Sequence, residues 1–249
     1  MRFYKLLKYD LKNGLVSDYM KLSVLIVIII AFCFDFYLRK YNVYLLAEQI
    51  PSGTFVDYLL YIFAGMKEYL PTDEEGFIFP IRWSLLHLYI FYCTLHYPSK
   101  DLTSVGVNIL LRTKGRTSWW LSKSIWNICY VLAVYLLIFL TVMLFCLVMK
   151  EPIHLDITAM FMNDILEAKS PYETFSTNLI WITLFFPLLF SIGMNLWQMT
   201  LTLFFKPLYS FGASAVILLA SAYFFHPLFS RESRNANSKC VCSRKRLFD

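Results

Sequence analysis

Five stretches of the chain are apolar and long enough to cross a lipid bilayer. A membrane-crossing helix needs about 17–25 residues that are mostly apolar. The stretches that meet this requirement are residues 22–38, 79–97, 125–149, 176–205 and 208–228. The fourth is longer than one crossing needs, so we expect a helix that is tilted or kinked near Pro187. The pattern predicts an all-α polytopic bundle, with residues 1–228 forming a single transmembrane domain.

The N-terminal residues show an amphipathic pattern. Between residues 2 and 16, apolar side chains recur at helical spacing on one side and lysines lie on the other. The apolar set is Phe3, Leu6, Leu7, Leu11 and Leu15, and the lysines are Lys5, Lys8 and Lys12. One interpretation is an interfacial helix that lies flat on the inner leaflet, with its lysines near anionic headgroups. The other is a cytosolic helix that packs on a protein partner.

The charges between the apolar stretches orient them. The loop at 98–124 carries a single acid, Asp101, against the basic residues Lys100, Arg112, Lys114, Arg116 and Lys123. Short loops rich in Lys and Arg stay in the cytoplasm. The loops at 39–78 and 150–175 are acidic in balance. We therefore expect the N-terminus and loop 98–124 inside, and the two acidic loops outside.

Two tryptophans stand where the basic loop ends and the third span begins. Indole rings favour the headgroup region of a bilayer, and Trp119 and Trp120 directly precede the apolar run. We predict that these two residues, with Lys123, anchor the third span at the inner membrane interface.

A partly apolar stretch, residues 55–70, lies inside the first acidic loop. If it crossed the membrane, the basic loop at 98–124 would lie outside, which the charge rule opposes. We therefore expect a helix that lies at the surface.

The basic tail at 229–249 conflicts with this topology. Five spans would place it outside, although it holds Arg231, Arg234, Lys239, Arg244, Lys245 and Arg246. Either a weaker span is misassigned, or the tail replaces a sixth helix. Its polarity predicts disorder. Cys240 and Cys242 form a CxC pattern there, for which solvated thiols are favoured over palmitoylation or metal binding.

Composition supports a membrane protein. The chain is 58% hydrophobic and 18% aromatic, and only 16% of its residues are charged. This exceeds what a soluble domain buries. The net charge of +6 follows membrane sidedness, so it does not predict a nucleic-acid partner.

Candidate chemistry is sparse. There is no GxxxxGK pattern ending in Ser or Thr to cradle phosphates, and no HExxH motif. We therefore expect no ATPase, hydrolase or metal site in this chain, and any energy must come from a partner. Asp35 lies near the outer end of the first span, where an acid reaches water. His87 lies within the second span, where a hydrogen-bonded packing role is favoured over proton transfer or metal binding.

The order of parts resembles the permease subunit of the second type of ABC exporter. The resemblance rests on the amphipathic N-terminal helix, a span, an acidic loop, a second span, and a basic loop reading ILLRTKGRTSWWLSKSIWNI before further spans. It is closest to small permeases of bacteriocin or antimicrobial-peptide export and immunity in Gram-positive bacteria. Such a permease is a multi-pass protein of the cell membrane, usually with six spans.

The resemblance also implies partners and a contact site. In that family a coupling helix in the loop between spans two and three docks on an ATPase subunit, which binds ATP and Mg²⁺. Here the helix would lie within Leu102–Leu111, and we expect the contact to use Leu102, Val105, Ile109, Arg112 and Arg116. A second copy or a different permease would complete the membrane domain. An apolar, aromatic path would suit an amphipathic or peptide-like substrate. The alternative is a membrane scaffold or sensor subunit that transports nothing, since an inner-leaflet anchor has the same basic loop with tryptophans.

Overall fold

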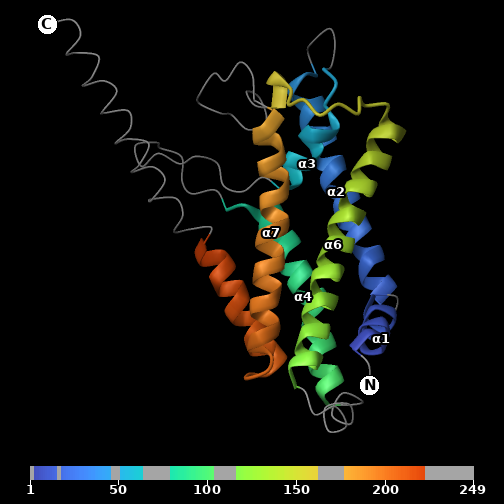
Figure 1. The fold of residues 1–249 in the computed structure, drawn as a ribbon. Helices are drawn as coiled ribbons and strands as arrows, with labels where there is room; N and C mark the ends of the chain where they lie inside the picture. Colours follow the sequence, from blue (N-terminus) through green and yellow to red (C-terminus); the bar gives the residue numbers. More distant parts are fainter. Residues whose placement is uncertain are drawn as a thin grey trace, which may run out of the picture.

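The computed structural model describes residues 3–15, 18–45, 51–63, 79–103, 116–161 and 177–221, and no strand occurs among them. The helices are α1 (Phe3–Leu15), α2 (Tyr19–Val43), α3 (Phe55–Phe63), α4 (Ile81–Thr103), α6 (Arg116–Met149), α7 (Thr177–Leu201) and a last helix, Pro207–Ser221. Figure 1 shows α2, α4, α6 and α7 running side by side as a bundle. The prediction of an all-α fold is confirmed for this part of the chain.

Three of the described helices are long and apolar enough to cross a membrane. They are α2, the part of α6 from Thr117 to Met149, and the part of α7 from Leu184 to Leu201. They coincide with the first, third and fourth predicted spans. The outer face of α6 repeats an exposed leucine every fourth residue, at Leu132, Leu136, Leu140 and Leu144. A continuous apolar stripe of this kind suits lipid and not water.

The other two predicted spans are also helical. α4 covers most of residues 79–97 and continues to Thr103, with Pro98 inside the helix. The helix Pro207–Ser221 covers most of 208–228, but it is shorter than a full crossing. That these two helices span a membrane stays a prediction. The tail at 229–249, with Cys240 and Cys242, lies outside the described residues.

The prediction of a surface-lying helix at 55–70 is wrong for the part that is described. Eight of the nine residues of α3 are buried, from Val56 to Phe63. The helix packs against α2, α4, α6 and α7. Its aromatic rings hold it there: Tyr58 meets Phe36 of α2 at 4.5 Å between ring centroids, and Phe63 stacks on Tyr135 of α6 at 5.5 Å. α3 therefore belongs to the core of the bundle.

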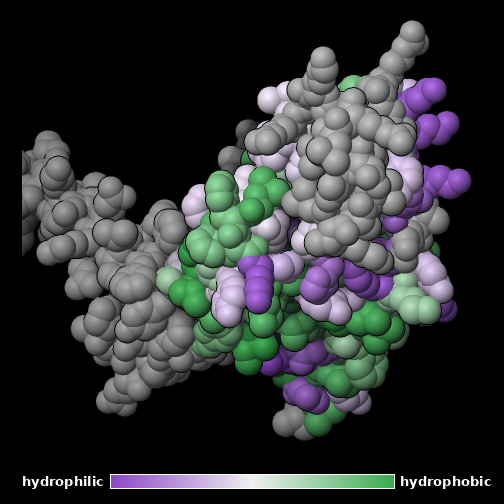
Figure 2. Space-filling model, turned by 90° about the horizontal axis from the view of Figure 1, so that it is seen from below, coloured by the Kyte–Doolittle hydropathy of each residue, from purple (hydrophilic) through white to green (hydrophobic). Residues whose placement is uncertain are grey.

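The two ends of the bundle differ. We call the end that carries α1, the last turn of α4 and the start of α6 the basal end, and the end that carries α3 and residues 150–161 the distal end (Figure 1). The roots of the basic loop, Thr103 and Arg116, lie at the basal end, and the described parts of both acidic loops lie at the distal end. Figure 2 views the basal end and shows hydrophilic residues along its right-hand edge and hydrophobic residues gathered in its lower part.

Candidate functional site at the base of the bundle

The N-terminal helix is tied to the bundle by a buried ion pair. Asp10 of α1 and Lys123 of α6 are both 0% exposed, and Lys123 Nζ lies 2.6 Å from Asp10 Oδ1. Ser122 Oγ donates to the other carboxylate oxygen at 2.6 Å. The Tyr97 hydroxyl of α4 donates to Asp10 Oδ1 at 3.1 Å. We call Asp10, Tyr97, Ser122 and Lys123 the Asp10 cluster.

Each charge of the Asp10 cluster is compensated. Removing a carboxylate and an ammonium group from water is costly, and the pair is tolerated only if further polar contacts surround it. Here the hydroxyl groups of Ser122 and Tyr97 donate hydrogen bonds to the carboxylate. The ammonium group also faces aromatic rings, 4.5 Å from the centroid of Tyr97 and 5.9 Å from that of Trp119. The cluster therefore fixes the three helices with defined geometry.

A close backbone contact adds to the attachment of α1. A Cβ on Gly14 would overlap Nε1 of Trp126, a fully buried ring of α6. Trp126 in turn stacks on Tyr97 at 4.2 Å between ring centroids. Only glycine lets α1 approach α6 this closely. The buried stripe of α1 consists of Leu6, Asp10 and Gly14, at four-residue spacing, while Lys5, Lys8 and Lys12 are exposed.

The Asp10 cluster joins the two roots of the basic loop. Tyr97 precedes residues 104–115 on α4, and Ser122 and Lys123 follow them on α6. A single carboxylate on α1 therefore contacts side chains on both sides of residues 104–115. Any displacement of the loop's roots changes the surroundings of Asp10.

The predicted coupling residues fall at or beyond the edge of the described structure. Leu102 lies in the last turn of α4, and Arg116 is the first residue of α6; the described structure does not extend to either side chain. Val105, Ile109 and Arg112 lie outside the described residues. Their role in coupling stays a prediction.

The predicted interface anchors have different surroundings from one another. Trp120 is exposed, as an anchor requires, whereas Trp119 is buried and Lys123 is paired with Asp10. Asp10 was not among the residues predicted from the sequence, although one signal was present. It is the acid four residues after Leu6 and four before Gly14, on the apolar side of the helix.

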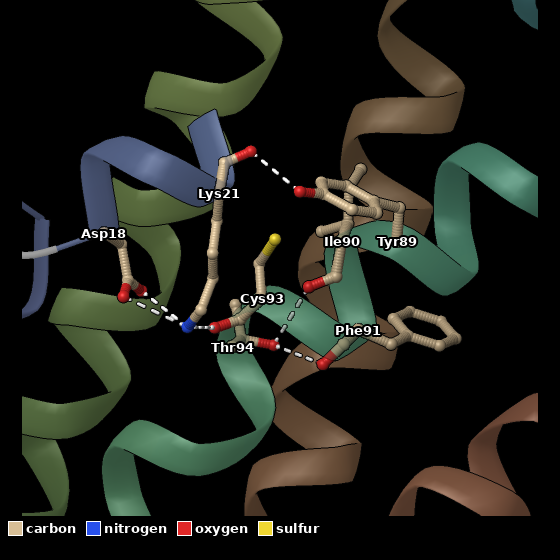
Figure 3. Close-up of polar contacts among 7 residues, drawn as sticks. All are labelled: Asp18, Lys21, Tyr89, Ile90, Phe91, Cys93 and Thr94. Atoms are coloured by element: carbon tan, nitrogen blue, oxygen red, sulfur yellow. Dashed lines mark hydrogen bonds and ion pairs between the residues drawn. The ribbon is translucent and has the colours of Figure 1, made fainter. Parts of the chain in front are cut away.

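A second contact fixes the start of α2 on α4 (Figure 3). Lys21 Nζ lies 3.0 Å from Asp18 Oδ1 and also donates to the carbonyl oxygen of Cys93 at 3.3 Å. The Tyr89 hydroxyl donates back to the carbonyl oxygen of Lys21 at 2.7 Å. These contacts reach α4 about one turn from Tyr97 of the Asp10 cluster. The described side chains of α1 and α2, and the α6 side chains of the cluster, therefore meet at the same part of α4.

Buried polar side chains also line one face of α7. They recur at helical spacing, at Ser191, Asn195 and Gln198, and Thr202 continues the series just after the helix ends. Thr94 of α4 donates to Asn195 Oδ1 at 2.6 Å, and Gln198 Nε2 donates to the carbonyl oxygen of Phe91 at 3.0 Å. In an apolar environment such contacts specify which helices pack together. The spacing of these four residues could have predicted this face.

Two buried carboxylates, Glu151 and Asp57, connect the segments at the distal end. Glu151 pairs with Lys40 of α2 and accepts a hydrogen bond from the backbone N–H of Gly53 at 2.9 Å. Asp57 of α3 accepts from the backbone N–H of Thr54 at 2.9 Å and from Thr158 Oγ1 at 2.7 Å. Burial raises the pKa of Asp57, while the hydrogen bonds from Thr54 and Thr158 oppose that rise. Residues 150–161 are thereby held against α3.

The histidine inside α4 has the packing role that was predicted. His87 is fully buried, and its Nδ1 donates to the carbonyl oxygen of Trp83 at 2.8 Å. Its ring packs edge to face on Phe190 of α7 at 5.4 Å. Over the described ranges of the chain, no three His, Cys, Asp or Glu side chains gather to hold a metal ion.

Comparison with known proteins gave no relative: no family model, no curated protein and no solved structure matches the chain.

Proposed function

We propose that the chain is the permease subunit of an ABC exporter, with ATP and Mg²⁺ bound by a separate ATPase subunit. The observation that carries the proposal is the Asp10 cluster, which connects both roots of the basic loop to the N-terminal helix. A coupling loop must pass the movement of an ATPase to the membrane helices. Roots that share one buried ionic contact would move together, so this arrangement suits such a transfer.

The membrane arrangement follows from the charges of the loops. The bundle crosses the cell membrane five times, with its basal end in the cytoplasm and its distal end outside. The exposed lysines of α1 then face anionic headgroups of the inner leaflet, while Asp10 and Gly14 face α6. A second permease copy or a different permease completes the membrane domain. The transported substrate is amphipathic or peptide-like, which fits spans with few charges and many aromatic residues.

The test is co-purification with an ABC ATPase and transport by the pair. Substituting Val105 and Ile109 by Asp places unpaired charge on the predicted docking face, and we expect ATPase binding and transport to be lost while membrane insertion survives. Ser104→Asp is the matched control, because Ser104 lies on the opposite side of the predicted helix 102–111.

Either of two results would overturn the proposal. One is a double Asp variant that still binds its ATPase and still transports. The other is a wild-type chain that binds no ATPase, which would favour the scaffold or sensor alternative.

A further inference from the structure

A group of charged residues lies on the outside of the bundle at the distal end. Asp35 of α2 contacts Arg39 on the same helix and Arg82 on α4; each guanidinium group lies 3.4 Å from Asp35 Oδ2. Two cations therefore share one carboxylate among the described residues. We call Asp35, Arg39, Arg82 and the adjoining Tyr61 the Asp35 patch.

The Asp35 patch is held in place from below by a buried ring. Tyr61 of α3 is 1% exposed and donates its hydroxyl hydrogen to Asp35. The Arg82 guanidinium carbon lies 3.6 Å from the centroid of the Tyr61 ring, and that of Arg39 lies 6.0 Å away. Cation–π contacts of this kind orient the guanidinium groups before any ligand arrives. A ligand that binds them therefore has less side-chain entropy to overcome.

The outer side of the Asp35 patch remains accessible. The exposed side-chain fractions are 58% for Arg39, 44% for Asp35 and 27% for Arg82. A guanidinium group has five N–H donors, and each arginine uses one of them on Asp35. Donors and one unit of positive charge are thus available for an anion.

The surroundings of the Asp35 patch are apolar and exposed. Phe34 and Leu38 flank Asp35 on α2, and Ile81 and Leu85 flank Arg82 on α4. Phe34 and Leu85 lie further from the distal end than the arginines do. A soluble anion would gain nothing from these side chains, whereas the acyl chains of a lipid would cover them.

We propose that the Asp35 patch binds the phosphate headgroup of an anionic phospholipid in the leaflet at the distal end. The phosphate oxygens accept hydrogen bonds from Arg39 and Arg82, in the forked geometry that arginine offers to phosphate. Its single negative charge balances the excess positive charge of the patch. The acyl chains lie along Phe34 and Leu85. This site is separate from the basal end and does not depend on the proposed transport function.

The test is lipid retention by the purified full-length chain. Protein stripped of lipid in a neutral detergent is titrated with phosphatidylglycerol or phosphatidylcholine, and bound lipid is counted by native mass spectrometry. We expect Arg39→Gln and Arg82→Gln each to weaken phosphatidylglycerol binding about fivefold, the effect of one basic residue near an anionic lipid. Phosphatidylcholine binding should not change. Lys150→Gln is the matched control, because Lys150 is an exposed cation at the same end but outside the patch.

The outcomes separate a lipid site from other readings. The proposal is overturned if the arginine variants retain phosphatidylglycerol as the wild type does, or if Lys150→Gln weakens it equally. Competition by soluble glycerol phosphate as strong as by the lipid would also overturn it, because the apolar flanks would then contribute nothing. Thermal unfolding shows whether each variant is folded. If Arg82→Gln does not fold, the lipid binding of Arg39→Gln decides the test, since Arg39 is the more exposed of the two arginines.

Discussion

We expect the loss of Asp10 or Lys123 alone to destabilise the fold more than the loss of both together. Both side chains are fully buried, so the Asp10 carboxylate would lose its ion pair without Lys123. Removing one member of a buried ion pair costs about 3–5 kcal/mol, whereas replacing both members is often neutral. A single variant of the Asp10 cluster should therefore lose more stability than the double variant.

We expect Lys123→Met to lower the free energy of unfolding by about 3–5 kcal/mol, because it leaves the Asp10 carboxylate buried without a cation. Adding Asp10→Asn should restore most of that loss, since an amide oxygen still accepts from Ser122 or Tyr97 without carrying charge. Chemical unfolding in detergent gives the two values. Equal losses in the single and the double variant would show that Lys123 acts through its bulk and not through its charge.

Single residues also mark the limit of what the sequence could predict. The sequence placed Lys123 near the basal end but assigned it to the membrane interface, because its partner lies 113 residues away. Charge counts tell which side of a membrane a loop occupies, but they do not pair a given cation with a given anion. Asp35 is partly exposed, and its position near water stays a prediction. Its arginine neighbour on α4 is 47 residues away and was not foreseen.

At the scale of elements, helices were predictable and their partners less so. Periodicity gave α1, and apolar length gave α2, α6 and α7, because these signals are local. α3 was placed wrongly, since the charge rule predicts only that residues 55–70 do not cross the membrane. Whether such a helix lies on the surface or inside depends on the aromatic residues of α2 and α6 that receive it.

The packing of α1 on α6 gives a prediction at this scale. Gly14→Ala places a methyl group against the Trp126 ring, which stacking on Tyr97 holds in place, so we expect a loss of about 1–3 kcal/mol in stability. Gly212→Ala is the control, because a Cβ there meets nothing within 4 Å in the helix Pro207–Ser221. It should be neutral or stabilising by up to about 1 kcal/mol.

Protease sensitivity distinguishes local from general loosening in the Gly14→Ala variant. We expect faster cleavage near residues 16 and 17, between α1 and α2, and an unchanged pattern at the distal end. If Gly14→Ala unfolds at the same denaturant concentration as Gly212→Ala, the close approach of α1 to α6 is not needed for stability.

At the scale of the whole molecule, the two ends of the bundle can be compared with the predicted sides of the membrane. The sequence sorted the loops by charge alone, without knowing which of them are neighbours. In the structure the roots of the basic loop share the basal end with α1, and residues 150–161 share the distal end with α3. The described parts of the two acidic loops therefore lie at the same end, opposite the roots of the basic loop, which a sorting by chance would not require. Which end faces the cytoplasm stays a prediction.

Cysteine labelling in cells tests this orientation. In a chain whose six native cysteines are replaced, Thr113→Cys reports on the basic loop and His154→Cys on the exposed distal segment. With an impermeant thiol reagent we expect His154→Cys to react in intact cells, and Thr113→Cys to react only after the membrane is opened, because the basic loop is retained inside. Reaction of Thr113→Cys in intact cells would reverse the orientation. It would also put the Asp10 cluster outside, where no ATPase subunit could reach the loop that the cluster holds.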